Sequence, residues 1–159
     1  MKRIILFDSI AVMAGLLFAN IYNSLVDAEN WCSKIPESII DLRNYYAVSN
    51  PGNFYRLFSP LNQLLALASL VLFWRNGVKV RLFLALALAF ALIGEAMTFG
   101  YFYPRNEILF AADISTSLDQ VVESCHQWQS MNWVRSLVVL VALVFQFSAL
   151  DKIGSWTKA

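Results

Sequence analysis

Charged residues are scarce in this sequence of 159 residues. Asp, Glu, Lys and Arg together make up 14% of it, against about 25% in an average globular protein, and the formal net charge is +1. Such a chain lacks the basic surface that nucleic-acid phosphates require, so nucleic acid is not an expected partner. Disordered segments are poor in apolar residues, whereas 58% of this sequence is hydrophobic. The composition therefore argues against a disordered chain as well.

Residues that commonly build metal and redox sites are few. His126 is the only histidine, and no cluster of cysteines and histidines accompanies it, so we expect no metal centre. The two cysteines, Cys32 and Cys125, are far apart, whereas a dithiol redox enzyme normally has a Cys-x-x-Cys pair. The sequence also contains no glycine-rich phosphate loop and no serine-centred nucleophile motif.

Long hydrophobic runs make up much of the remaining sequence. A helix needs about 20 apolar residues to cross the hydrocarbon core of a membrane. Four segments reach this length fully or nearly, and we expect spans at residues 4–26, 59–74, 81–103 and 131–150. The predicted fold class is an all-α integral membrane protein, an antiparallel up-down bundle of four transmembrane helices that forms one domain over residues 1–159.

Basic residues predict the orientation of these spans, because cytoplasmic loops carry an excess of Lys and Arg. The long loops 27–58 and 104–130 contain four basic residues against eight acidic ones. We therefore expect both termini in the cytoplasm, as in a bacterial inner membrane, and both loops outside. The basic residues that lie at the termini or in the short link between the second and third spans are Lys2, Arg3, Arg75, Lys79, Arg81, Lys152 and Lys158.

The first span admits a second interpretation as a cleaved signal peptide, since it has a basic start, an apolar run and small residues near Ala28. The apolar run is longer than a typical signal core, and Asp8 interrupts it. Cleavage would also leave an odd number of spans. We therefore expect an uncleaved anchor.

Cap and turn residues predict where helices begin near the loops. Ser59-Pro60 has the pattern of an N-cap followed by proline at the first helical position, which places the start of the second span there. The Asn-Pro-Gly-Asn run at residues 50–53 predicts a turn within the first loop, after a short helix in residues 36–48.

The second loop is predicted to lead directly into the fourth span. Ser115 or Thr116 can cap a helix, and no proline or glycine follows before that span ends. We expect one long helix, with a break near His126 as the alternative. Cys32 and Cys125 lie one in each outer loop and would face an oxidising compartment, where disulfides persist, so we predict a structural disulfide between them.

Polar side chains within the spans are expected at one depth. Ionisable groups in a membrane are costly and usually face the interior of the bundle. With a rise of 1.5 Å per residue, Glu95 lies about 12 Å below the outer end of its span, Asn20 about 9 Å and Arg135 about 6 Å. Asn62 is three residues into the second span. An antiparallel bundle would bring the four into one layer of the outer half, where Arg135 can reach Glu95.

Helical spacing adds further members to this layer. Thr98 follows Glu95 by three residues, and Trp128, Asn132 and Arg135 are spaced four and three residues apart on one face of a helix. The layer predicts a polar pocket in the outer half that binds a lipophilic small molecule. The alternative is that these polar groups only hold the helices together.

Two short motifs lie in the second half of the chain, namely Thr-x5-Pro-x-Asn in residues 98–106 and Trp-x3-Asn-x2-Arg in residues 128–135. With the spans around them they resemble the anthrone-oxygenase-like family of small four-span membrane proteins. The resemblance implies oxidation of a lipophilic anthrone or related polyketide to a quinone by oxygen, with no metal, flavin or other cofactor bound. The positions that carry over are Pro104, Asn106, Trp128, Asn132 and Arg135.

The common depth of the polar residues motivates hypotheses for their roles in such a reaction. Glu95 or His126 would act as the base, and Arg135 and Asn132 would stabilise an enolate. A non-catalytic membrane scaffold or partner-assembly protein, with its loops packed outside the membrane, is the alternative function. Its partners would be membrane lipids, another membrane protein or a second copy of the chain. The residues expected to contact the ligand are Asn20, Asn62, Thr98, Asn106, Trp128 and His126.

Overall fold

The computed structural model describes residues 2–156, in which every regular element is a helix and there is no strand. Lys158, one of the basic residues used to predict the orientation, lies outside the described residues. Two of the elements are single π-helical turns, η1 and η2. In chain order the elements are α1 (Lys2–Tyr22), η1 (Asn23–Asp27), α2 (Ala28–Trp31), α3 (Glu37–Tyr45), α4 (Pro51–Leu72), α5 (Val78–Met97), η2 (Thr98–Phe102), α6 (Tyr103–Ala111) and α7 (Ile114–Trp156).

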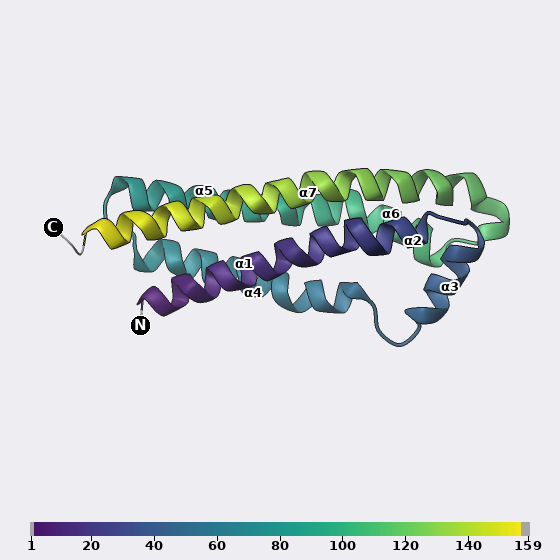
Figure 1. The fold of residues 1–159 in the computed structure, drawn as a ribbon, viewed down its shortest axis with the longest axis horizontal. Helices are drawn as coiled ribbons and strands as arrows, with labels where there is room; N and C mark the ends of the chain where they lie inside the picture. Colours follow the sequence, from purple (N-terminus) through teal and green to yellow (C-terminus); the bar gives the residue numbers. More distant parts are fainter. Residues whose placement is uncertain (1, 157–159) are drawn as a thin grey trace.

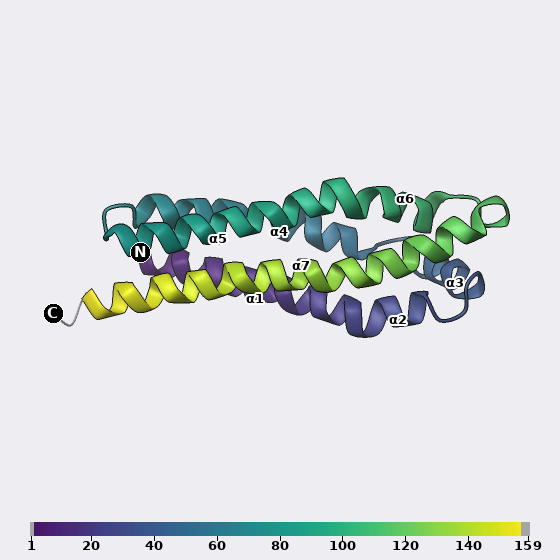
Figure 2. The same cartoon turned by 90° about the horizontal axis from the view of Figure 1, so that it is seen from above.

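The long elements α1, α4, α5 and α7 run side by side (Figure 1). α1 packs against α4 and α7, and α5 packs against the same two helices. Both ends of the chain and the α4–α5 turn lie at one end of the molecule, which we call the terminal end. The short helices α2, α3 and α6 lie at the opposite end, which we call the loop end (Figures 1 and 2).

Three helical stretches are long and apolar enough to cross a membrane, and they fit an integral membrane protein. They are Lys2–Trp31, Val78–Ala111 and Ile114–Gly154. Their apolar side chains on the outer surface, such as Phe18 and Leu137, suit contact with lipid. α4 is not among the three, because polar residues in its first half lower its hydropathy. A fourth span in α4 therefore stays a prediction.

α4 begins nine residues earlier than the sequence suggested. Its N-cap is Asn50, whose Oδ1 accepts a hydrogen bond from the backbone N–H of Gly52 at 2.9 Å, and Pro51 is the first helical residue. The predicted cap at Ser59-Pro60 is wrong, since Pro60 lies inside the helix. The run at residues 50–53 starts a helix and does not form a turn, because asparagine and proline favour both settings.

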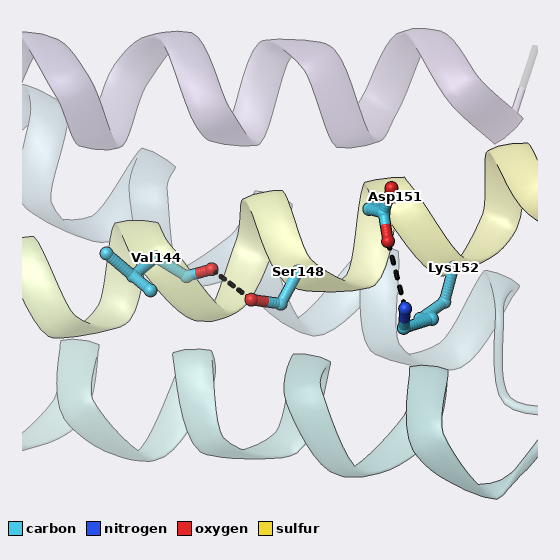
Figure 3. A network of polar contacts seen from close by, with 4 residues as sticks. All are labelled: Val144, Ser148, Asp151 and Lys152. Carbon is cyan, nitrogen blue, oxygen red and sulfur yellow. Dashed lines mark hydrogen bonds and ion pairs between the residues drawn. The ribbon is translucent and has the colours of Figure 1, made fainter.

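α7 has a kink at Ser117, where φ is −128° and ψ is 22°. From Leu118 onward it is one long helix, as predicted, without a break near His126. At 1.5 Å per residue, the continuous part at residues 118–156 extends about 58 Å, almost twice the roughly 30 Å hydrocarbon core. Near the terminal end, the Ser148 hydroxyl donates to the carbonyl of Val144, and Lys152 pairs with Asp151 at 3.0 Å (Figure 3). Ser148 thus satisfies its polar group within its own helix.

Two hydrophobic cores are separated by a polar layer. The core of the terminal end includes Leu6, Leu84 and Ala142, and the core of the loop end includes Leu109 and Val121. Asn20, Asn62, Asn132 and Arg135 belong to this layer, whereas the buried polar residues Ser9, Ser124 and Gln146 lie within the stretches that enter the two cores. The predicted disulfide is confirmed: it joins Cys32, just after α2, to Cys125 of α7, with the two Cα atoms 5.9 Å apart.

Candidate active site

Two π-helical turns interrupt the long helices at the polar layer. In η1 the N–H of Ala28 bonds to the carbonyl of Asn23, and in η2 the N–H of Tyr103 bonds to the carbonyl of Thr98. Each of these bonds spans five residues instead of the four of an α-helix, which inserts an extra residue into the turn. Such turns occur frequently at functional sites. The sequence analysis did not predict either of them.

Asn132 is the hub of the polar layer and is fully buried. Its Nδ2 donates to the carbonyl of Asn20 at 2.8 Å and to the Ser24 hydroxyl at 2.7 Å. Its Oδ1 accepts a hydrogen bond from Nη2 of Arg135 at 2.5 Å. Both of its donors and its acceptor are therefore engaged within the protein. Asn132 connects α7 to α1 and orients Arg135.

Arg135 is enclosed by aromatic rings, and only 7% of it is exposed. Its guanidinium carbon lies 4.0 Å from the ring centroid of Phe102, 5.4 Å from that of Tyr55 and 5.9 Å from that of Trp128. Cations are attracted to aromatic faces at these distances. The expected ion pair with Glu95 does not form, since no contact within 4.0 Å joins these two side chains in residues 2–156.

The position of Asn132 explains why Arg135 does not form an ion pair with Glu95. Asn132 lies one turn before Arg135 on the same helix, so its amide reaches the guanidinium, whereas Glu95 projects from α5. The two charges still act on each other through space. Glu95 is half-buried.

Tyr55 links α4 to α1, a contact that the sequence analysis missed. Its hydroxyl donates to Oδ1 of Asn20 at 2.9 Å and accepts a hydrogen bond from Nδ2 of Asn23 at 3.0 Å. With a helix assumed to begin at Ser59, Tyr55 was assigned to a loop. The cap at Asn50 was the signal that could have placed Tyr55 on the helix.

A cavity of about 660 Å³ lies at the loop end, lined by the first half of α4, by α5, η2, α6 and α7, and by parts of α3 and η1. Its volume is in the range of small-molecule sites. The polar groups on its inner side include Glu95, Thr98 and Arg135, and Asn106 lies on its wall. The aromatic residues that line it are Trp31, Tyr46, Tyr55, Phe99, Phe102, Tyr103, Phe110 and Trp128.

A chamber of about 40 Å³ adjoins this cavity toward the terminal end. Asn20 and Asn62 line it, together with apolar side chains such as Met13 and Val139. Five residues line both spaces and thus form the floor that separates them: Tyr55, Ser59, Glu95, Thr98 and Arg135. The chamber is small, but the Glu95 carboxyl and the Arg135 guanidinium line it as well as the cavity.

Arg43 of α3 holds α6 in place beside the cavity. Its three guanidinium nitrogens donate to the carbonyls of Ile108, Leu109 and Ala112 at 2.9–3.3 Å. These carbonyls are the unsatisfied acceptors at the end of α6, so Arg43 acts as its C-terminal cap. Arg43 itself lines the cavity, and the sequence analysis did not select it.

Comparison with protein families identifies the chain. A family model described as anthrone oxygenase matches residues 53–145, which is more than half of the sequence. The chain belongs to the anthrone oxygenase family. The resemblance inferred from the two motifs is thereby confirmed. No curated protein and no solved structure matches the chain.

The match includes most of the elements around the cavity. It covers nearly all of α4, the whole stretch from α5 to α6, and α7 as far as Phe145. α1 and η1 lie outside the matched residues, although they supply Asn20 and Ser24 to the polar layer. A site in this member of the anthrone oxygenase family thus combines matched residues with a helix that the match does not reach.

The structure brings together most, but not all, of the predicted site residues. Trp128 lines the cavity and donates from its Nε1 to Oδ1 of Asn106 at 2.9 Å. Asn132 does not line the cavity, because its hydrogen bonds to α1 hold it behind Arg135. His126 is exposed and lines neither space, since two helical residues turn it about 200° away from Trp128.

In the described part of the chain, no group of three His, Cys, Asp or Glu side chains could hold a metal ion. Tyr46, which lines the cavity just after α3, has a markedly raised pKa. Burial raises the pKa of Tyr46 to about 12, and the negative charge of Asp27 adds to this effect. Tyr46 therefore presents a neutral phenol to the cavity over the whole physiological range.

Proposed function

We propose that this protein binds a flat, lipophilic phenol of the anthrone type in the large cavity and oxidises it to a quinone with oxygen. The observation that carries the proposal is the position of Glu95 and Arg135 on the floor of a cavity with aromatic walls. Membership of the anthrone oxygenase family agrees with this substrate class.

The aromatic walls suit a flat ligand. Trp31 contacts Trp128 with ring centroids 5.1 Å apart, and Phe102 contacts Trp128 at 5.5 Å, both edge to face. Side chains fixed in this way present preset faces and edges to an aromatic ring system. Burial of such a ligand would gain free energy in proportion to the apolar area removed from water.

The chemistry assigns one role to each polar group. Glu95 takes a proton from the methylene carbon of the anthrone, and the guanidinium of Arg135 stabilises the resulting enolate oxygen. The carbanion form of the enolate then reacts with oxygen directly. The methylene carbon loses both hydrogens and gains one oxygen atom, and the second oxygen atom leaves with these hydrogens as water. Asn132 acts in this scheme only by orienting Arg135.

Substitution of the base tests the proposal. Glu95→Gln should lower anthrone turnover in detergent or vesicles by about 100-fold or more, because a neutral amide accepts no proton. Quinone formation is followed by absorbance, with spontaneous oxidation subtracted. Glu123→Gln is the matched control, since Glu123 is an exposed carboxylate of α7 that lines neither space. Equal activity of the two variants would contradict the role of Glu95.

We also propose a topology, in which α4 is a fourth span, both termini are cytoplasmic and the loop end is outside, with one membrane domain over residues 1–159. α4 supports this by running beside α1 and α5. The disulfide at the loop end supports it too, because disulfides persist outside the cytoplasm.

Labelling can test this topology, because neither native cysteine is a free thiol. A new thiol in the α4–α5 turn, Asn76→Cys, should react with a membrane-impermeant maleimide only from the cytoplasmic side. A thiol at the loop end, Ser115→Cys, should react only from outside. Labelling of both positions from the same side would overturn the four-span arrangement.

A non-catalytic scaffold is the second candidate, and one observation favours it. Buried polar contacts also join α1 and α7 far from the cavity, where Nε2 of Gln146 donates to the Ser9 hydroxyl at 2.8 Å. Such contacts hold membrane helices together without any ligand. Under this alternative, Glu95→Gln would reduce the folded yield, and the wild-type protein would not bind or oxidise an anthrone.

A further inference from the structure

The chamber beneath the cavity is bordered by two buried polar atoms that have no partner. Asn62 is 6% exposed and Arg135 is 7% exposed, and both residues line the chamber. Oδ1 of Asn62 and Nε of Arg135 make no hydrogen bond within the described residues. One of these atoms is an acceptor and the other is a donor. Buried polar atoms are rarely left in this state, so each requires an explanation.

We propose that the chamber is a binding site for ordered water, which accepts a hydrogen bond from Nε of Arg135 and donates one to Oδ1 of Asn62. A water needs about 10–15 Å³ of free volume and two to four polar partners. The chamber offers about 40 Å³, so one water fits with room for a second. Glu95, Thr98 and Ser59 line the same space and offer further hydrogen-bonding groups.

This water completes the surroundings of a charge that has no carboxylate within ion-pair distance. A buried guanidinium is costly unless its N–H groups are hydrogen-bonded. Nη2 of Arg135 donates a hydrogen bond to Asn132, aromatic rings cover one face of the guanidinium, and Nε donates to the chamber water. Asn62 is thus a positioning residue: through the water it fixes the direction of the guanidinium. That consequence rests on the proposed function, whereas the presence of the water does not.

The water itself is tested without any activity. A structure of the purified protein, at a resolution that shows waters, should contain density within hydrogen-bonding distance of both atoms. Infrared difference spectra between H₂¹⁶O and H₂¹⁸O should show a confined water band. Both signals should disappear in Asn62→Leu, which removes the acceptor and fills the space. An empty chamber in the wild-type protein would overturn the proposal.

A second variant separates this site from general packing. Ser69 lies seven residues after Asn62 on α4, and its buried hydroxyl also lacks a partner, but it does not line the chamber. Ser69→Ala should keep the water band. Asn62→Ser, which restores an acceptor and leaves room, should also keep it, and this variant serves if Asn62→Leu does not fold. Loss of the band in Ser69→Ala would contradict the assignment.

The positioning role is tested by turnover. Asn62→Leu should lower kcat for an anthrone at least 10-fold with little change in KM, and it should alter the pH profile, because Asn62 lines only the chamber. Asn62→Ser should recover most of the rate. If the water is present but kcat is unchanged in Asn62→Leu, the positioning role is wrong. If the wild-type protein has no turnover, the proposed function fails while the water site stands.

Discussion

Asn132 and Arg135 form one unit on α7, in which the amide oxygen of Asn132 accepts a hydrogen bond from the guanidinium at 2.5 Å while the amide nitrogen donates to α1 and to η1. The position of Arg135 at the cavity floor therefore depends on α1, although α1 acts on the guanidinium only through Asn132.

Replacement of the hub should affect both stability and binding. Asn132→Leu removes three buried hydrogen bonds and leaves the guanidinium without its acceptor, so we expect a loss of about 2–4 kcal/mol in unfolding free energy. Thermal unfolding in detergent measures it. Gln146→Leu is the control, because it breaks a similar α7–α1 contact away from the cavity. A loss of anthrone affinity in both variants alike would contradict a specific role for Asn132.

Removal of the disulfide should destabilise the loop end. The cysteines are 93 residues apart, and closure of a loop of this length is worth roughly 4–5 kcal/mol in the chain-entropy model. Cys32→Ser and Cys125→Ser should each lower the unfolding temperature, and the double variant should lower it no further. Electrophoretic mobility of the wild-type monomer should change with reductant. A monomer that migrates identically with and without reductant would show that the bridge does not form.

Arg43 should be irreplaceable by lysine as the cap of α6. A lysine ammonium is a compact point charge and lacks the planar fork with which Arg43 reaches three carbonyls. Arg43→Lys should therefore speed amide hydrogen exchange of residues 106–112 by about 10-fold, as expected for one lost hydrogen bond. Asp41→Asn, an exposed change on the same helix, is the control. Unchanged exchange in Arg43→Lys would contradict the capping role.

Alkaline pH should loosen the packing around Tyr46. The pKa of its phenol is about 12 in the folded protein and about 10.0 in a free side chain. The folded state therefore holds the proton more tightly, and this contribution to stability is complete below pH 10 and disappears as the pH rises through 12. Tyrosinate absorbance and unfolding should be followed over this range. Tyr46→Phe should lack the Tyr46 titration step and lose less stability; identical curves would contradict the assignment.

The start of α4 shows how one local choice limited the sequence-based prediction of the site. Asn50-Pro51 and Ser59-Pro60 have the same cap-and-proline pattern, but from the sequence the first was interpreted as part of a turn and the second as the start of the helix. The structure uses Asn50, which adds two turns to the helix and places Tyr55 against α1. Propensity cannot separate two valid caps when tertiary contacts stabilise the extra turns.

The polar partners were harder to predict than the depth of the layer. Helical rise placed Asn20, Asn62, Glu95 and Arg135 at similar depths, and the four residues do line one small chamber. The pairing of these polar side chains depends on the rotation of each helix about its axis and on the turns η1 and η2. Hydropathy gives no signal for the rotation or for the turns. Arg135 consequently binds Asn132 and aromatic rings in place of Glu95.

The amino-acid sequence by itself determined the all-helical character, the apolar helices suited to a membrane, the cysteine pair and the family, because these follow from composition, period and short motifs. Only the tertiary structure decided that Tyr55 and Arg43 belong to the cavity, that His126 does not, and that Asn132 stands behind its wall. These outcomes depend on angles of a few tens of degrees between packed helices, which interdigitating side chains from distant segments set together.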